Sequence, residues 1–300
     1  MPSSKPARRS KPVAADIDVF GLTDTGRVRS DNQDHFLIAS LHKLLKVQRT
    51  SLPEPNLTDL VSETRGYLFL VADGVSGQPD GHVASGTVLR TVAEYVTDFM
   101  NLYRRLDSQM ETPFLDELAR SVERSHAVLR KQAPSDGSDE SLATTLTMVA
   151  VLWPRAYLVQ VGDSRCYRLR DGALELLSQD QTIAQALVDS GALTPEEARR
   201  SPFRGILASA IGGPTADPMT FATDCRWDDI LLLCTDGLTR HVSDEEIEAE
   251  LRTIESAEQS CRRLVERALE RGGRDNVTVV IGRLRPQPGS DAIGVDVDAA

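Results

Sequence analysis

Two long apolar runs in this chain end in the same dipeptide, Asp-Gly. The run "YLFLVADG" ends at Asp73 and Gly74, and the run "ILLLCTDG" ends at Asp236 and Gly237. Apolar runs of this length are typical of strands that are buried on both faces, and Asp-Gly is a turn signal. A single such ending indicates a turn and nothing more. Two of them predict a β-rich core with carboxylates at the ends of its strands.

Other runs with strand character surround these two. They are "IDVFGLT", "HFLIA", "TLTMVAVLW", "AYLVQVG", "CYRLR" and "NVTVVIGRL". Helical periodicity appears in two pairs of segments, residues 82–106 with 114–132 and residues 243–253 with 257–273. Because the strands cluster between the two helix pairs, the sequence predicts stacked sheets covered by helices, an α+β sandwich.

Shorter signals refine this outline. Ser243 followed by Glu246 is a capping-box pattern, and Gly272 suits a helix stop. Residues 182–200 have a helical pattern. The segment that follows, 201–218, has no regular pattern and is expected to form either a mobile flap near a site or a surface connection.

Length and composition bound the organisation of the chain. Its 300 residues with 40% hydrophobic content suit one large domain or two small ones. We expect a folded unit over residues 17–285, between a disordered basic tail at 1–16 and a disordered acidic tail at 286–300. Residues 41–66 are expected to be a loop extension inside that unit.

Charge and cysteine content exclude several classes of function. The net charge of −11 disfavours binding to nucleic acid or to an anionic membrane. The four cysteines lack CxxC or zinc-finger spacing and are expected to be reduced, buried thiols. The N-terminal segment lacks the apolar stretch of a secretory signal, and no apolar run is long enough to span a membrane. The expected location is the cytoplasm.

Two more acidic residues lie beside predicted strands. Asp163 follows "AYLVQVG", and Asp275 stands just before "NVTVVIGRL". If these strands are neighbours, their ends bring both carboxylates into one cluster with Asp73 and Asp236. Crowded buried carboxylates must be protonated or neutralised by cations, because an unpaired buried charge is very costly. Oxygen ligands without a histidine or thiolate pattern indicate a hard cation, Mg²⁺ or Mn²⁺.

Such a ligand set predicts a type of chemistry. Two cations a few ångströms apart can activate water and polarise a phosphoryl oxygen without a covalent enzyme intermediate. The substrate phosphate then needs a bidentate cation, and Arg29 in "RSDNQD" is the candidate because a guanidinium matches phosphate geometry. Other reactive residues fit less well, since the five histidines lack HExxH spacing and Ser76 in "DGVSG" departs from the GxSxG nucleophile pattern.

Taken in order, these motifs resemble those of the metal-dependent Ser/Thr protein phosphatases of the protein phosphatase 2C type, bacterial branch. The matching segments are "RSDNQD", "VADGVSG" with "GHVAS", "LATTLT", "VGDSRCYRLRDG", "LVDSGALTPEEA", "LLLCTDGL" with "VSDEEI", and "RDNVTVV". The resemblance implies a four-layer αββα sandwich with two central, mainly antiparallel sheets flanked by helix pairs. It makes residues 17–285 a phosphatase catalytic domain with a dinuclear Mn²⁺ or Mg²⁺ centre at one end of the sheets.

The resemblance also implies roles for the acidic residues. Asp73 would bridge the two metal ions, and Gly74 would offer its backbone carbonyl to one of them. Asp236 and Asp275 would complete the other metal site. Asp73 and Asp236 would therefore be the catalytic residues.

Three further roles follow from the same resemblance. Asp34 would hold a water of the metal centre, and Arg29 would bind the substrate phosphate. Asp163, together with Asp236, matches the position that holds a third, weaker metal ion in bacterial relatives.

The implied function is hydrolysis of phosphoserine and phosphothreonine in proteins by attack of a metal-activated water, which reverses the action of a Ser/Thr kinase. Most of the catalysis would come from positioning and charge neutralisation. The implied partners are phosphorylated proteins, either a Ser/Thr kinase or its targets.

Several positions depart from the family pattern and leave alternatives open. Gln33 stands where many relatives have Glu, Arg240 stands where Asp is frequent, and the segment "FRGILASAIGG" lacks two residues of the usual motif. One alternative is therefore a pseudophosphatase that binds or regulates phosphoproteins without catalysis. A two-metal nuclease or other phosphoesterase would use the same carboxylates, but the acidic charge counts against it.

Overall fold

Two five-stranded antiparallel sheets form the centre of the protein. The computed structural model describes residues 12, 16–42, 44–46, 59–61, 66–75, 80–100, 110–132 and 142–285. The first sheet has the order β1-β12-β11-β8-β9 and contains β1 (Ile17–Asp24), β8 (Arg165–Arg170), β9 (Ala173–Leu176), β11 (Ile230–Cys234) and β12 (Val277–Leu284). The second has the order β10-β7-β6-β5-β2 and contains β2 (Asp34–Leu41), β5 (Gly66–Asp73), β6 (Leu146–Leu152), β7 (Arg155–Val161) and β10 (Met219–Asp224).

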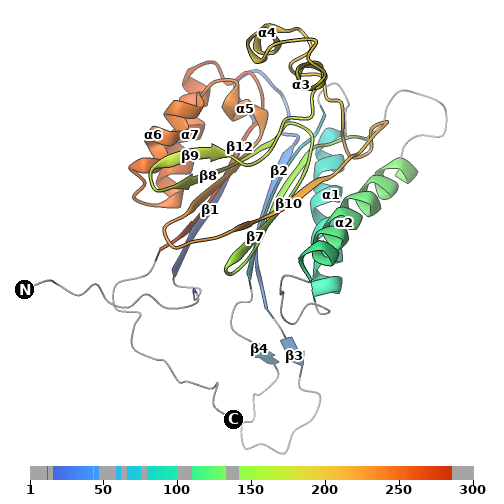
Figure 1. Ribbon diagram of the computed structural model, residues 1–300, viewed down its shortest axis with the longest axis vertical. Helices are drawn as coiled ribbons and strands as arrows, with labels where there is room; N and C mark the ends of the chain where they lie inside the picture. Colours follow the sequence, from blue (N-terminus) through green and yellow to red (C-terminus); the bar gives the residue numbers. More distant parts are fainter. Residues whose placement is uncertain are drawn as a thin grey trace, which may run out of the picture.

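Helix pairs cover the outer faces of the two sheets (Figure 1). The second sheet is covered by α1 (Gly81–Met100) and α2 (Glu111–Gln132), and the first by α6 (Asp244–Arg252) and α7 (Ala257–Glu270). Two shorter helices, α3 (Ile183–Asp189) and α4 (Pro195–Arg200), lie at the upper end of the view. The predicted four-layer αββα sandwich is therefore confirmed.

The alternation of side chains along β5 explains why this strand is apolar up to its last residue, Asp73. Leu68 and Leu70 pack with α1 and α2, whereas Phe69 and Val71 face the space between the two sheets. Successive residues of a strand point to opposite faces, so a strand that is covered on both faces needs apolar residues at every position. Strand β11 divides in the same way between the helix side and the inter-sheet core.

Several elements differ from the sequence-based expectation. The edge strands β9 and β10 were not expected, because their side chains are exposed or half-buried and lack an apolar pattern. Residues 41–66 are more than a loop extension, since β3 (Leu44–Lys46) and β4 (Asp59–Val61) pair within them as a small antiparallel ladder. The helical region 182–200 divides into α3 and α4, and each begins with a threonine cap.

The predicted helix signals around α6 and α7 are confirmed. Ser243 and Glu246 form a reciprocal capping box at the start of α6. Helix α7 ends at Glu270, and Gly272 then adopts a positive φ of 122°. This left-handed backbone conformation is readily accessible to glycine, so Gly272 ends the helix and directs the chain toward β12.

All four cysteines are free and buried, as the sequence predicted. Among the helices of the described ranges, none combines the length and apolar character needed to cross a membrane. Most of the two tails, Ser76 and the loop between β3 and β4 lie outside the described residues.

Strands β1 and β12 pair along their full lengths at one edge of the first sheet. Ile17 is opposite Leu284, and Asp24 is opposite Val277. The start of β1 and the end of β12 therefore lie together, at the opposite end of the ladder from the turn that precedes β12.

Candidate functional site

Antiparallel pairing places two of the predicted metal ligands side by side. Asp34 is the first residue of β2 and Asp73 is the last residue of β5, and the register pairs them directly. An antiparallel pair always brings the start of one strand beside the end of its neighbour. The sequence motifs that contain Asp34 and Asp73 are thus brought together by the sheet itself.

The other three carboxylates come from the corresponding end of the first sheet. Asp236 begins the short helix α5 (Asp236–Thr239) directly after β11, and Asp275 lies two residues before β12. Asp163 lies in the turn between β7 and β8 and is 8% exposed. The charges of the other four carboxylates all contribute to the raised pKa of Asp73, and we use the name acidic cluster for the set Asp34, Asp73, Asp163, Asp236 and Asp275.

Asp34 connects the two sheets through its side chain. Its Oδ2 accepts hydrogen bonds from Thr235 Oγ1 at 2.8 Å and from Thr278 Oγ1 at 2.7 Å. Thr278 lies in β12 of the other sheet, and Thr235 directly follows β11 of that sheet. Its Oδ1 is buried and has no hydrogen-bond partner in the described structure. Burial raises the pKa of Asp34 to about 7, and the negative charges of Asp236 and Asp275 add to the rise.

Asp73 is fixed by its backbone. Its N–H donates to Thr145 Oγ1 at 3.0 Å, while its carbonyl accepts from Thr145 N at 2.9 Å and from Thr144 Oγ1 at 2.8 Å. Burial, followed by the charge of Asp34, raises the pKa of Asp73 well above its usual value. These three hydrogen bonds hold the backbone of Asp73 and do not involve its carboxylate.

The remaining carboxyl groups are perturbed by the same two causes. Burial and the charge of Asp236 raise the pKa of Asp163 to about 8. Burial raises the pKa of Asp236 to about 6, although the nearby guanidinium of Arg240 acts in the opposite direction. When several carboxyl groups with raised pKa values lie together, added positive charge stabilises their ionised forms.

Two arginines supply part of this positive charge. Arg29 makes a bidentate contact with Asp275, with Nε 2.8 Å from Oδ1 and Nη2 2.9 Å from Oδ2. Arg240 contacts the same Oδ2 through Nη1 at 2.9 Å and forms a second ion pair with Asp236. The sequence predicts that Arg29 binds the substrate phosphate. In the structure Arg29 pairs with Asp275, which is a predicted metal ligand.

Close backbone packing explains the glycine after Asp73. The N–H of Gly74 donates to the carbonyl of Gln33 at 3.1 Å, and a Cβ at Gly74 would lie 2.5 Å from the carbonyl oxygen of Gly81. A heavy atom cannot approach that closely, so any side chain at position 74 would separate β5 from the start of α1. This packing holds the predicted carbonyl ligand in place.

Asn276 is a site residue that the sequence reasoning missed. Its Nδ2 donates to the carbonyls of Thr25 and Asp31, both at 2.9 Å, and its Oδ1 accepts from Gln33 N at 2.9 Å. This one side chain therefore holds the "RSDNQD" segment against the start of β12. Its position beside Asp275 in "RDN" was visible, but its partners lie more than 240 residues away along the chain.

Three of the five histidines make hydrogen bonds within the fold. Nδ1 of His35 bonds Ser85 Oγ, His126 Nδ1 accepts from Gly212 N, and His241 Nε2 accepts from Arg274 N. None of these partners belongs to the acidic cluster.

The donor set fits hard divalent cations. In the described part of the chain, no three His, Cys, Asp or Glu side chains converge closely enough to enclose an ion. Two of the five acids, Asp236 and Asp275, are instead paired with Arg240 and Arg29. The unpaired Oδ1 of Asp34 and the raised carboxyl pKa values nevertheless provide oxygen donors that a Mg²⁺ or Mn²⁺ ion would satisfy.

The segment 201–218 approaches Arg240, the arginine that pairs with Asp236 and Asp275. A Cβ placed on Gly205 would lie 3.4 Å from Nη2 of Arg240. Its neighbours Phe203 and Ile206 are 45% and 49% exposed, which is high for large apolar side chains. The segment thus lies beside Arg240, and its role as a mobile flap or as a surface connection stays a prediction.

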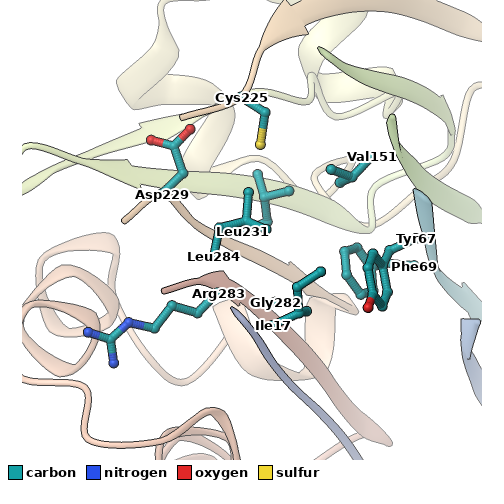
Figure 2. A pocket seen from close by; sticks show the side chains of 10 residues that line it. All are labelled: Ile17, Tyr67, Phe69, Val151, Cys225, Asp229, Leu231, Gly282, Arg283 and Leu284. Carbon is teal, nitrogen blue, oxygen red and sulfur yellow. The ribbon is translucent and has the colours of Figure 1, made fainter. Parts of the chain in front are cut away.

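Figure 2 shows an apolar hollow between the sheets that is separate from the acidic cluster. Its walls include Tyr67, Phe69, Leu231 and Leu284. Its volume of about 10 Å³ is close to that of one water-sized sphere, so it has no room for a substrate. This hollow belongs to the packing of the two sheets.

Comparisons with known proteins agree with the geometry. A family model for protein phosphatase 2C matches residues 56–277. The serine/threonine protein phosphatase PstP of Mycobacterium tuberculosis is 38% identical over 214 residues, which are 71% of this chain and 40% of PstP. The chain thus spans about 40% of the length of this relative.

Solved structures show the same fold. The crystal structure of the Mycobacterium tuberculosis serine/threonine phosphatase PstP/Ppp matches with a TM-score of 0.71 at 32% identity, over 90% of this chain and 99% of that one. The catalytic domain of PstP in complex with two manganese ions matches with a TM-score of 0.68 at 31% identity, over 90% and 99% of the two chains.

Proposed function

Because the chain belongs to the protein phosphatase 2C family, we propose that it hydrolyses phosphoserine and phosphothreonine esters of proteins with the help of Mn²⁺ or Mg²⁺ ions. The observation that carries this proposal is the acidic cluster itself, five carboxylates delivered by both sheets to one end of the sandwich. The manganese ions of the PstP catalytic domain, a similar structure, support the choice of metal.

The metals would be held by oxygen atoms of the acidic cluster. Asp73 would hold both ions, Gly74 would add its carbonyl oxygen, and Asp236 and Asp275 would complete the set. Asp163 would contribute to a third, weaker position beside Asp236. When bound, the ions lower the pKa of water and neutralise charge on the phosphoryl group.

The residues of the chain would orient the reacting groups. Asp34 Oδ1, which is buried and unpaired in the described structure, is available to accept a hydrogen bond from the attacking water. Arg29 already holds two oxygen atoms of a carboxylate in a forked geometry. The same fork matches two oxygens of a phosphate and would fix the ester for in-line attack.

The test is hydrolysis of a phosphothreonine peptide by the full chain with Mn²⁺. We expect turnover that disappears with EDTA and falls by about a thousandfold or more in Asp236→Asn, since an essential ligand is lost. A phosphate diester should be a poor substrate, and efficient cleavage of the diester alone would favour a nuclease-type phosphoesterase. Equal, trace turnover by wild type and Asp236→Asn would refute the proposal.

One observation favours a second candidate, a pseudophosphatase that binds phosphoproteins. Arg29 and Arg240 already neutralise part of the acidic cluster without any metal. In this case the chain would bind a phosphopeptide in the presence of EDTA and would take up no Mn²⁺ in calorimetry. Uptake of two Mn²⁺ ions together with turnover would exclude it.

The proposal extends to the cellular setting. The substrates would be proteins phosphorylated by a Ser/Thr kinase, or that kinase itself, in the cytoplasm. The catalytic unit would be residues 17–285, flanked by disordered tails. Phosphoproteomes of cells with and without the protein would identify its substrates, and limited proteolysis would test the boundaries of the unit.

A further inference from the structure

Arg240 places a positive charge directly beside two carboxylates of the acidic cluster. It follows Asp236 by one helical turn, and its N–H donates to the Asp236 carbonyl at 2.9 Å. This position directs the guanidinium back over the acidic cluster, where it contacts the carboxylates of Asp236 and Asp275. Both of these carboxylates are proposed metal ligands.

The contacts of Arg240 use the same oxygen atoms that a metal would need. Oδ2 of Asp275 receives Arg240 Nη1 at 2.9 Å and Arg29 Nη2 at 2.9 Å, and Oδ2 of Asp236 receives Arg240 Nη2. Hydrogen bonds occupy the lone pairs of a carboxylate oxygen, and a divalent ion binds through those lone pairs. The guanidinium and an ion therefore compete for Asp236 and Asp275.

The Arg240 side chain has a route away from these carboxylates. It is 45% exposed, whereas the side chains of Asp236 and Asp275 are 14% and 12% exposed. Gly205 lies next to the guanidinium, where an added Cβ would stand 3.4 Å from Nη2. Because Gly205 has no side chain, none from this position of the segment 201–218 crowds Nη2.

We propose that Arg240 is a resident counter-ion of the acidic cluster, which a divalent metal must displace from Asp236 and Asp275 in order to bind. In the metal-free chain it holds two acids that would otherwise repel each other. On metal binding it moves outward beside Gly205. This inference rests on the proposed metal-dependent function, and it predicts that Arg240 sets the free metal concentration at which the site fills.

The experiment measures Mn²⁺ binding by calorimetry on the full, EDTA-treated chain, so it does not depend on turnover. We expect Arg240→Gln to bind Mn²⁺ about tenfold more tightly than wild type, the change that results from removing one competing charge-assisted contact. Arg262→Gln removes the same charge from an exposed residue of α7 that pairs with Glu258, and it should bind as wild type does. Unchanged or weaker binding in Arg240→Gln would overturn the inference.

A second measurement needs no variant and so covers the case in which Arg240→Gln folds poorly. Phenylglyoxal modifies free guanidinium groups, and mass spectrometry reports the modified residue. Mn²⁺ should increase the rate at which Arg240 is modified and leave the rate at Arg262 unchanged. Protection of Arg240 by Mn²⁺ would overturn the inference. Mn²⁺ uptake with these changes but without hydrolysis would refute the proposed function and leave the role of Arg240 standing.

Discussion

Asp34 reaches from one sheet to the other, where its Oδ2 accepts a hydrogen bond of 2.7 Å from Thr278 Oγ1. Thr278 also lies within hydrogen-bond distance of Thr23, so the carboxylate joins a short hydroxyl chain inside the first sheet. Because Oδ2 is satisfied by hydroxyls and Oδ1 is not, the two oxygens of one carboxylate have different environments.

The burial of Asp34 makes the metal-free protein sensitive to pH. Its pKa is about 7 in the folded chain and 3.8 in the unfolded one. Between these two pH values, the folded state therefore binds the proton more tightly than the unfolded state does. Stability therefore falls as pH rises through this window. In EDTA, we expect the free energy of unfolding to decrease by about 1 to 4 kcal/mol between pH 5.5 and pH 7.5, measured by urea denaturation.

Asp34→Asn isolates this contribution. The amide can still accept from Thr235 and Thr278 but does not titrate, so the decrease with pH should be shallower than in wild type. It should not vanish, because Asp163 also has a raised pKa, of about 8. An identical pH dependence in the two proteins would show that Asp34 is not a source of the effect.

Two glycines, Gly74 after β5 and Gly86 in α1, should respond in opposite ways to alanine. Gly74→Ala places a methyl group 2.5 Å from the Gly81 carbonyl oxygen, and we expect a loss of at least about 2 kcal/mol in stability. Gly86 lies inside α1, and its nearest atoms are 3.8 Å away, in the His35 ring. Gly86→Ala should stabilise the protein by about 0.5 to 1 kcal/mol through helix propensity. Thermal unfolding of both variants checks the contrast.

Removing the side chain of Asn276 should loosen the "RSDNQD" segment. Asn276→Ala leaves the carbonyls of Thr25 and Asp31 and the N–H of Gln33 without their partner. We expect a loss of about 2 to 4 kcal/mol, because buried polar groups that lose a partner keep their desolvation cost. As a control, Gln185→Ala removes an exposed amide from α3 and should change stability by less than about 0.5 kcal/mol. Similar unfolding midpoints in urea for the two variants would contradict this role.

Arg29 should act on phosphate binding more than on metal binding. Arg29→Lys keeps the charge but loses the fork that holds two oxygens, so we expect KM for a phosphothreonine peptide to rise about tenfold, with a smaller change in kcat. Mn²⁺ affinity should not fall, since Arg29 competes for Asp275 and does not support it. A large loss of kcat at constant KM would instead show that Arg29 acts in the transition state and not in substrate binding.

The strand ends could be predicted from sequence because local pattern and tertiary structure agree there. Strand β11 is apolar at every position and β5 is apolar until its last residue, Asp73. The first polar residues, Asp73 in β5 and Thr235–Asp236 after β11, mark where the two strands leave the core. Asp34 required the register of β2 against β5, which a single sequence does not contain. Its position in the cluster came from the family resemblance.

Other parts of the site depend on contacts that sequence patterns do not encode. Thr278 donates to a residue 244 positions away, and Asn276 bonds three backbone groups at similar separations. Arg240 was noticed as a departure from the family pattern, but its ion pairs required the fold of α5 and the approach of Asp275. Long-range side-chain pairing of this kind is fixed only when the two sheets have packed.

The pairing of Ile17 with Leu284 determines where attachments to this domain would emerge. Strand β12 rises about 3.3 Å per residue, so its end lies roughly 25 Å from the turn that carries Asp275. A fluorescent reporter, an affinity handle or a surface tether joined beyond Leu284 would therefore start on the far side of the sandwich from the carboxylates. Immobilised this way, the protein would present its acidic end to the solution.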